Sequence, residues 1–278
     1  MISRFLRLLR ARRRGPGVEI KTPDELDAMR AAGLIVARTL SAVQETARPG
    51  VSTAELDELA EQSIRDAGAV PAFKGYHGFP GSICASVNEQ VVHGIPDTDA
   101  VLRDGDLLSV DCGAVLDGWY GDAAVTIALG ETSEADRALS ERTRQAMLAG
   151  VDAARAGSRL TDISHAVQRS VEQARSADAA AYGLVTEYGG HGIGRAMHMD
   201  PFLPNAGRRG KGPRLEPGMA LAIEPMLTGA SAETVELDDG WTVVTSDNSR
   251  AAHWEHTVAI TTDGPWVLTT LEDARLAC

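Results

Sequence analysis

The chain has 278 residues, of which 44% are hydrophobic and 24% charged, a composition typical of a globular protein with one or two domains. Its net charge of −12 excludes a general affinity of the folded body for nucleic acid. Three cysteines without a CxxC pair argue against a disulfide framework or a thiolate metal site and indicate a reducing compartment, so we expect a cytoplasmic protein. No apolar run is long enough to predict a transmembrane helix.

The N-terminal segment differs from the rest of the chain. Residues 1–14 contain six arginines and no acidic residue, and the arginines interrupt the apolar run too often for a secretory signal. This composition is typical either of a flexible tail or of a basic arm that contacts ribosomal RNA or another anionic surface. Gly-Pro-Gly at 15–17 indicates a hinge, so we expect a basic extension over residues 1–17 and a single domain over residues 18–278.

Two helices are predicted at the start of this domain. Thr22 is a helix cap, Pro23 suits the first turn, and Glu25 completes a capping box, so a helix is expected from here to about residue 47. Ser52 and Glu55 have the same spacing and predict a second helix after a break in the chain.

The second half of the chain repeats this order of helices. Ser133 precedes another long helix, and the segment 155–163 (RAGSRLTDI) resembles the segment 48–56 (RPGVSTAEL). Strand-like segments follow each pair of helices. We therefore predict two related α+β halves within one domain, about residues 18–130 and 131–270, with a site between them.

A hairpin in the first half carries two aspartates. Asp117-Gly118 predicts a two-residue turn, which would make Asp111 and Asp122 diagonal neighbours on one face of the hairpin. Two adjacent carboxylates repel each other, and a bound cation removes that repulsion. The alternative is a hairpin with two exposed aspartates and no metal. Cys112 points to the other face and is expected in the core.

Two more carboxylates lie in apolar strands, Glu224 after LAI and Glu255 before HTVAI. A glutamate in such a strand is unfavourable unless it is paired or binds metal. Together with the two aspartates and one neutral histidine, these residues predict an oxygen-rich site for two divalent ions about 3.5–4 Å apart. This ligand set favours manganese, iron or cobalt and leaves zinc as an alternative.

The histidine is expected from the stretch EYGGHGIGRAMHMDP, where glycines 189, 190, 192 and 194 surround His191. We expect these glycines to let the backbone approach the metals closely and bend sharply. His191 would be the single imidazole ligand, and His198 would reach the same cavity and donate a hydrogen bond to the substrate.

From about Val18 to about Thr270 the chain resembles the type I methionine aminopeptidases, metallopeptidases of the pita-bread fold. The resemblance rests on five stretches, GYHGFPGSICASVNEQVVHGIP (75–96), SVDCGAVLDGWYGD (109–122), GGHGIGRAMH (189–198), AIEPM (222–226) and WEHTVAITTDG (254–264). It implies an α+β fold of two pseudo-symmetric halves, an antiparallel sheet and a central dinuclear metal site. The resemblance implies that Asp122 and Glu255 bridge the two metals. It also implies that Asp111 chelates the first metal and that His191 and Glu224 bind the second.

The resemblance also implies an activity, the removal of the initiator methionine from nascent polypeptides when the second residue is small. A hydroxide that bridges the metals would attack the first peptide bond, and Glu224 would take and return the proton. His93 and His198 would bind the substrate and stabilise the tetrahedral intermediate. Only 26 positions separate His198 from Glu224, which leaves no room for the helical insertion of type II.

The methionine pocket is expected to be apolar. Phe73 and Met197 depart from the cysteine and phenylalanine that are common in the family at these positions, and Cys84 matches a pocket-side cysteine that is expected to be thiol-reactive. His253 and His256 flank Glu255 and are expected on the opposite face, in core or supporting roles. The substrate-binding residues that the resemblance implies are His93, His198, Phe73, Tyr76, His77, Phe79, Met197 and Trp241.

Two other functions share this fold. An Xaa-Pro aminopeptidase or prolidase has the same five ligands but usually a separate N-terminal domain, whereas here only about 20 residues precede the first predicted helix. A non-enzymatic binding protein of this fold would be expected to lose metal ligands, and all five are present. The sequence gives no sign of an obligate partner, so a monomer is expected.

Overall fold

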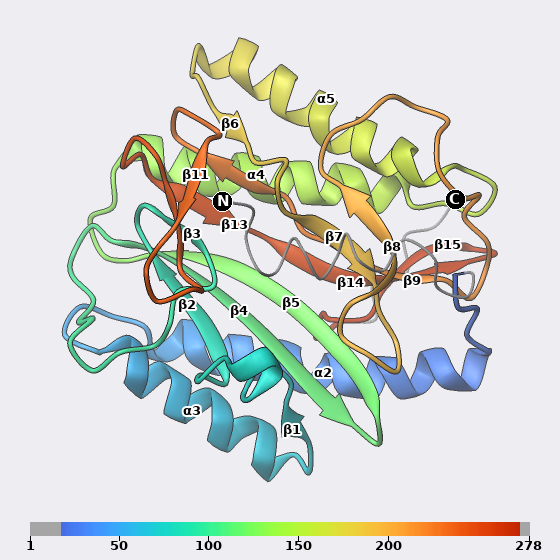
Figure 1. The fold of residues 1–278 in the computed structure, drawn as a ribbon, viewed down its shortest axis with the longest axis horizontal. Helices are drawn as coiled ribbons and strands as arrows, with labels where there is room; N and C mark the ends of the chain where they lie inside the picture. Colours follow the sequence, from blue (N-terminus) through green and yellow to red (C-terminus); the bar gives the residue numbers. More distant parts are fainter. Residues whose placement is uncertain (1–17, 273–278) are drawn as a thin grey trace.

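The computed structural model describes residues 18–272 and shows helices on the outside of a large, curved sheet (Figure 1). The predicted N-terminal extension therefore lies outside the described residues. The helices are α2 (Pro23–Thr46), α3 (Thr53–Asp66), the short 3-10 helix η1 (Tyr76–Gly78), α4 (Glu134–Ala153) and α5 (Leu160–Asp178). None of the described helices combines the length and the apolar composition that a bilayer crossing requires.

The strands belong to one large sheet and two small ones. The large sheet has nine antiparallel strands, and seven of them follow the order β1-β4-β5-β14-β9-β7-β8, while β2 also pairs with β4 and β15 with β14. The small sheets are β13-β10-β6 and β11-β12-β3. The strands are β1 (Val70–Pro71), β2 (Ile83–Val87), β3 (Gln90–Val92), β4 (Leu107–Leu116), β5 (Trp119–Ala128), β6 (Gly183–Leu184), β7 (Gly189–Gly192), β8 (Met199–Pro204), β9 (Ala220–Ile223), β10 (Met226–Thr228), β11 (Thr234–Glu236), β12 (Val243–Thr245), β13 (Ala251–His253), β14 (Glu255–Thr261) and β15 (Gly264–Val267).

The helix starts agree with the capping residues in the sequence. At α2, the Thr22 hydroxyl accepts a hydrogen bond from the Glu25 amide, and the Glu25 carboxylate accepts one from the Thr22 amide at 2.9 Å. Ser52 and Glu55 form the same reciprocal pair at α3, and Ser133 caps α4. These side chains satisfy amide groups that have no partner inside the helix, so the predicted starts are confirmed.

The β4–β5 hairpin has the predicted turn. Asp117 and Gly118 both have positive φ, 50° and 78°, which matches the right-handed twist of the strands that they connect. Leu116 pairs with Trp119, and the ladder continues in register to the far end of both strands. Strand β5 then pairs with β14, which joins the first half of the chain to the second within one sheet.

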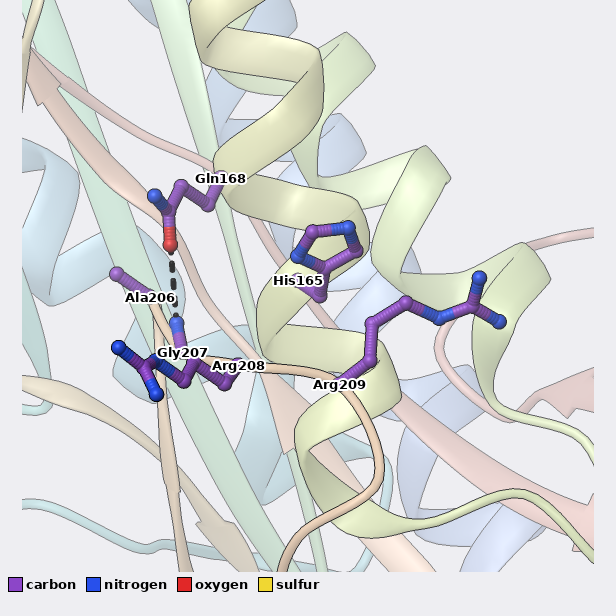
Figure 2. Close-up of a pocket in the computed structure, with 6 residues that line it drawn as sticks. All are labelled: His165, Gln168, Ala206, Gly207, Arg208 and Arg209. Carbon is purple, nitrogen blue, oxygen red and sulfur yellow. Dashed lines mark hydrogen bonds between the residues drawn. The ribbon is translucent and has the colours of Figure 1, made fainter.

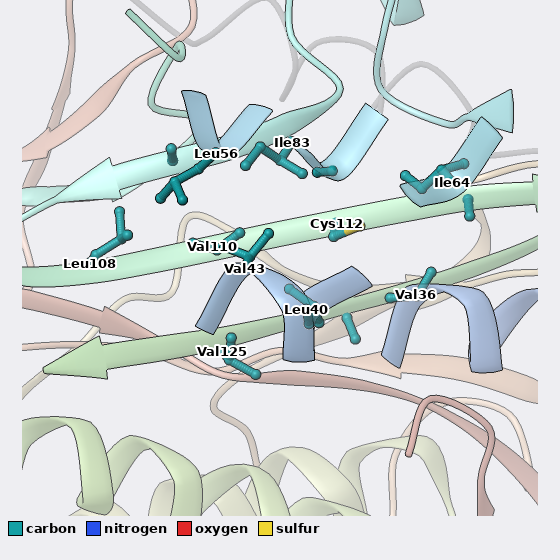
Figure 3. Close-up of a cluster of buried hydrophobic side chains, with 14 of the residues drawn as sticks. Val36, Leu40, Val43, Leu56, Ile64, Ile83, Leu108, Val110, Cys112 and Val125 are labelled. Atoms are coloured by element: carbon teal, nitrogen blue, oxygen red, sulfur yellow. The ribbon is translucent and has the colours of Figure 1, made fainter. Parts of the chain in front are cut away.

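The four long helices pack on one face of the large sheet. Cys112 of β4 lies with Leu40 of α2 and Leu56 of α3 in one buried cluster (Figure 3). Met147 of α4 lies with Val258 of β14 in another. Because strand residues alternate between faces, the residues next to Cys112 and Val258 in sequence point to the opposite face, away from the helices. The fold is thus of the predicted α+β class, and Cys112 is a core residue as expected.

Helix α2 approaches the sheet through two glycines. An added Cβ at Gly33 would lie 2.1 Å from the carbonyl oxygen of Leu268, and one at Gly121 of β5 would lie 2.8 Å from the Gly33 amide nitrogen. Both contacts are with backbone atoms, which cannot move aside as a flexible side chain can. The separation of α2 from β5 therefore depends on the absence of a side chain at Gly121, and its separation from Leu268, just after β15, depends on the absence of one at Gly33.

We predict that Gly33→Ala destabilises the protein by about 1–3 kcal/mol, because the methyl group forces α2 away from the sheet. Urea unfolding followed by circular dichroism measures this change. Asp27→Ala, on the exposed side of the same helix, is the control and should have a much smaller effect. A Gly33→Ala protein as stable as the wild type would contradict this account of the packing.

Candidate metal centre

Five neighbouring strands bring the five predicted ligands together on the face of the sheet without helices. Asp111 on β4 and Glu255 on β14 both pair with Ala124 of the strand between them, so all three share one face. Asp122 lies two residues from Ala124 on β5 and faces the same way. The predicted diagonal register of the two aspartates is therefore confirmed.

The remaining two residues come from the strands beyond β14. Ile223, the last residue of β9, pairs with His256, so the next residue, Glu224, lies beside Glu255. On β7, Gly192 pairs with Leu221 of β9, which places His191 opposite Ala222, on the same face as Glu224. Strands β4, β5, β14 and β7 thus contribute one side chain each, and the fifth comes from Glu224, directly after β9.

The side chains converge closely. The His191 Nε2 atom lies 3.4 Å from Glu224 Oε1 and 3.9 Å from Asp122 Oδ2. Single ligand atoms of Asp122, His191 and Glu255 all lie within 4.8 Å of one another. The His191 Nδ1 atom lies 2.9 Å from the carbonyl oxygen of Gly192, an acceptor only, so the ring proton is on Nδ1 and the Nε2 lone pair faces the carboxylates.

Burial makes this group of carboxylates costly to ionise. Burial raises the pKa of Asp111 from 3.8 to about 7. Burial, with the charges of neighbouring carboxylates as a smaller cause, raises the pKa of Asp122, Glu224 and Glu255 well above the usual range. Burial also lowers the pKa of His191 to about 4, so its imidazole is neutral and able to bind metal.

The free oxygen atoms fit a divalent metal. Among residues 18–272, one buried carboxylate oxygen each of Asp111, Asp122 and Glu255 has no hydrogen-bond partner. Buried polar atoms normally have partners, and a cation would supply one to each of these oxygens while it offsets the repulsion between the carboxylates. Four carboxylates and one imidazole are hard and borderline donors that suit first-row divalent ions.

The glycines around His191 let the backbone be approached closely, and the atoms that come close belong to the protein itself. None of the four has positive φ, but the β7–β8 ladder is irregular between His191 and Gly192 and the chain bends at Gly194. An added Cβ at Gly190 would lie 2.1 Å from the carbonyl oxygen of Ala222, and one at Gly192 would lie 2.2 Å from that of Asp200. The glycines let neighbouring strands approach β7 closely, and this packing holds His191 in place.

Two of the histidines implied to contact substrate lie near the five side chains or the apolar cluster beside them. The rings of His198 and His191 are 4.3 Å apart, and His198 Nδ1 lies 2.9 Å from the Tyr76 hydroxyl oxygen. The His93 ring lies 6.4 Å from that of Trp241, and burial lowers the pKa of His93 to about 4. His93 has a φ of 59°, an unfavourable backbone conformation that is often found at functional sites.

The residues of the predicted methionine pocket lie in one apolar cluster. Its buried members include Phe73, Phe79, Met197 and Cys84, and Tyr76 and Trp241 pack against them. His77, also predicted here, is exposed and has a φ of 50°, and its ring lies 4.4 Å from that of Tyr76. Burial raises the pKa of the Cys84 thiol, which opposes formation of the reactive thiolate.

The predicted face of His253 is wrong. Its Nε2 atom lies 3.8 Å from Glu224 Oε2 and 4.0 Å from Glu255 Oε2, so the ring faces the site. Residues two apart in an extended chain share a face, so the spacing of His253 and Glu255 was the signal that could have found the correct face. His256, one residue after Glu255, lies on the opposite face as expected, and its Nδ1 atom is 2.9 Å from the Thr269 hydroxyl oxygen.

A separate hollow of about 650 Å³ lies between α5 and the segment that follows β8 (Figure 2). The Gly207 amide donates a hydrogen bond to the Gln168 side chain across it, and His165, Arg208 and Arg209 also line it. None of the predicted site residues lines this hollow, so it is not part of the metal centre.

Comparison with known proteins agrees with this geometry. Residues 27–262 match the model of metallopeptidase family M24. The chain is 58% identical to methionine aminopeptidase 1 of Mycobacterium tuberculosis (strain CDC 1551 / Oshkosh) over 266 residues, which cover 96% of this chain and 99% of that protein.

Solved structures give the same result. The structure resembles methionine aminopeptidase from Thermotoga maritima with a TM-score of 0.88 and 42% identity, over 91% of this chain and 100% of that one. Prolidase from Pyrococcus furiosus, at a TM-score of 0.71 and 23% identity over 91% of this chain and 66% of that one, shares the fold alone. The chain has the pita-bread fold of these structures and belongs to metallopeptidase family M24, within its methionine aminopeptidases.

Proposed function

We propose that this aminopeptidase acts in the cytoplasm, on nascent polypeptides whose second residue is small. The observation that carries the proposal is the convergence of four carboxylates and one neutral imidazole from five adjacent strands, with apolar aromatic residues nearby. Such a site combines the ligands for a hydrolytic metal centre with a surface that can bind a methionine side chain. The restriction to a small second residue and the cytoplasmic location follow from the sequence resemblance and the cysteine content.

The five side chains would hold two divalent ions, and the candidate metals are cobalt, manganese, iron and zinc. Asp122 and Glu255 lie in the middle of the row of strands and are suited to contact both ions, with Asp111 on one side and His191 and Glu224 on the other. Bound divalent ions lower the pKa of coordinated water and polarise a peptide carbonyl. The protein itself supplies a fixed and largely buried set of donors for them.

Glu224 is the residue best placed to move a proton. Burial raises its pKa well above the usual range and its side chain is only 13% exposed, so this carboxyl accepts a proton more readily than an exposed glutamate does. His198 and His93 would donate hydrogen bonds to the substrate carbonyl and to the oxyanion that forms from it. The Tyr76 hydroxyl, 2.9 Å from His198 Nδ1, would orient that imidazole so that Nε2 faces the substrate.

The methionine side chain would bind against the apolar cluster. Phe79 and Trp241 make an edge-to-face contact with ring centres 5.1 Å apart, and Met197 is almost completely buried beside them. A thioether side chain such as that of Met197 adapts well to a second thioether and to aromatic edges. Phe73, Tyr76 and His77 would complete this pocket.

We further propose that residues 18–278 act as one catalytic domain and as a monomer. Residues of both predicted halves, about 18–130 and 131–270, contribute ligands, so neither half is expected to be active alone. One place where the halves meet is the β5–β14 pair, which also carries Asp122 and Glu255. The residues 1–14 would contact the ribosome through their arginines.

The proposed activity predicts that chelated enzyme regains turnover with added metal and releases methionine from Met-Ala-Ser. Leu-Ala-Ser and Ala-Pro-Ala should not be cleaved, because the pocket fits an unbranched thioether. Glu224→Gln should lower kcat by about 10²- to 10⁴-fold, since it removes the proton acceptor. Cleavage before proline would indicate a prolidase, and no cleavage with manganese, iron, cobalt or zinc would overturn the proposal.

Metal removal should make stability depend on pH. A carboxyl whose pKa rises on folding, from 3.8 to about 7 for Asp111, contributes stability that is present below the unfolded pKa and lost as pH rises through the folded pKa. A divalent ion replaces the protons and removes the repulsion. The increase in Tm on adding manganese should therefore be larger at about pH 8 than at about pH 5.

Thermal unfolding with and without a chelator tests this dependence. The protein with Asp122→Asn and Glu255→Gln together serves as the control, because it lacks two of the repelling charges and should show little pH-dependent gain from metal. An equal gain in Tm at both pH values in the wild-type protein would contradict the predicted coupling between protons and metal.

The role of the N-terminal arginines can be tested by deleting residues 2–14. Co-sedimentation with ribosomes should fall, and it should also fall with added salt in the full-length chain, because the contact is electrostatic. Hydrolysis of Met-Ala-Ser should not change, since the deleted residues precede the domain. Unchanged co-sedimentation after the deletion would exclude this role.

A further inference from the structure

His253 has an unusual position beside the metal centre. The side chain is only 2% exposed, and its Nε2 atom lies 3.8 Å from Glu224 Oε2 and 4.0 Å from Glu255 Oε2. Within residues 18–272, Nε2 has no hydrogen-bond partner. A buried ring nitrogen without a partner is unfavourable. Because Nε2 faces two ligand carboxylates, we expect its function to lie at the metal centre.

The backbone of His253 is held by the same strands that carry the aspartate ligands. Its amide donates to the hydroxyl oxygens of Ser109 and Thr126 at 3.2 and 3.0 Å, and its carbonyl accepts from Thr126 at 2.7 Å. Ser109 and Thr126 pair across β4 and β5 and lie on the same face as Asp111 and Asp122. The position of the imidazole is thus fixed relative to the ligands.

The carboxylate of Glu224 lies between two imidazoles. Its Oε1 atom is 3.4 Å from Nε2 of His191, and its Oε2 atom is 3.8 Å from Nε2 of His253. The His191 Nε2 atom has a lone pair facing Oε1, because its Nδ1–H donates to the carbonyl oxygen of Gly192. The two oxygens of Glu224 therefore have different neighbours.

We propose that His253 is a positioning residue of the metal centre, whose Nε2–H donates a hydrogen bond to Oε2 of Glu224. This rests on the proposed function, in which Glu224 both binds a metal and moves a proton. A carboxylate with two such tasks must not rotate freely, and a donor at Oε2 keeps Oε1 on the side of His191. Carboxylates that bind metals are commonly held by such hydrogen bonds.

The donor role fits the surroundings of His253 better than a role as metal ligand. A neutral imidazole carries one N–H, and next to two carboxylate oxygens the tautomer with the proton on Nε2 is favoured over one that presents a lone pair. The 3.8 Å separation is too long for a hydrogen bond, and a small rotation of the Glu224 carboxylate that shortens it by about 0.8 Å would form one.

The substitution His253→Leu removes the donor with little change in volume, whereas His253→Gln keeps an N–H group at similar reach. We expect His253→Leu to weaken manganese binding, measured by titration calorimetry, by about 10- to 100-fold and to lower kcat for Met-Ala-Ser more than it changes KM. His253→Gln should recover most of the affinity. Unchanged affinity and kcat in His253→Leu, or a His253→Gln protein as weak as His253→Leu, would overturn the proposal.

The matched control is His256→Leu, the same change on the opposite face of the sheet. It removes the contact with the Thr269 hydroxyl and should lower stability without altering manganese affinity. An equal loss of affinity in both leucine variants would show that loss of packing, and not of the donor, weakens metal binding, and would overturn the positioning role.

A second measurement compares the wild-type protein with His253→Gln and does not depend on whether His253→Leu folds. In zinc-loaded protein with ¹⁵N-labelled histidine rings, a slowly exchanging Nε2–H signal that is absent from the spectrum of His253→Gln supports the proposal. An Nε2 atom of His253 without a proton, as in a direct metal ligand, would overturn it. Because neither titration nor this spectrum measures peptide hydrolysis, failure of the proposed activity would be seen separately, as metal binding without turnover.

Discussion

Repulsion between four largely buried carboxylates is the constraint on which the rest of this structure depends. Asp111, Asp122, Glu224 and Glu255 lie on one face of one sheet, where burial raises the pKa of each. A chain that only had to fold would avoid this arrangement, because each ionised group disfavours the next. The repulsion is offset when cations bind, so affinity for metal and instability without it have the same physical origin.

The sheet has to hold these groups together against their repulsion, and its hydrogen bonds explain how it does so. The Thr257 hydroxyl donates to the Asp122 carbonyl at 2.8 Å and accepts from the Asp122 amide, so it links β14 to β5 where the two halves of the chain meet. The four helices cover the opposite face, and Gly33 and Gly121 let α2 lie directly on β5. The rigidity of the site thus comes from backbone contacts and packing on the far side of the sheet.

Local signals in the sequence predicted much of this arrangement. The Asp117-Gly118 turn fixes the register of the hairpin, and that register alone makes Asp111 and Asp122 diagonal neighbours. Capping boxes fixed the starts of α2 and α3 in the same way, because a cap and its partner are only three residues apart. The pairing of β5 with β14, more than 100 residues apart, has no local signal, and it was expected only through the repeated order of helices and the family resemblance.

The errors have equally specific causes. The glycines around His191 were expected to let the backbone approach the metals, but the atoms that require Gly190 and Gly192 belong to Ala222 and Asp200 on neighbouring strands, which the sequence does not place. His253 was assigned to the wrong face even though the period of an extended chain gave the correct one. No pattern in the sequence predicts that the His253 ring lies within 4.0 Å of two ligands, because that distance depends on where β13 lies relative to the site.

The methionine pocket and the metal centre are connected through β4, which limits how the pocket can vary. Gly113 lies two residues from Asp111, and an added Cβ there would be 2.8 Å from Met197 Cε and 2.9 Å from Phe73 Cε1. The two side chains that depart from the family pattern thus meet over a glycine of the strand that carries a ligand. A larger residue at Gly113 would push both into the pocket, whereas changes in Phe73 and Met197 themselves leave β4 in place. The pocket can therefore change its lining without moving Asp111, and this separation lets side-chain specificity vary while the metal ligands stay fixed.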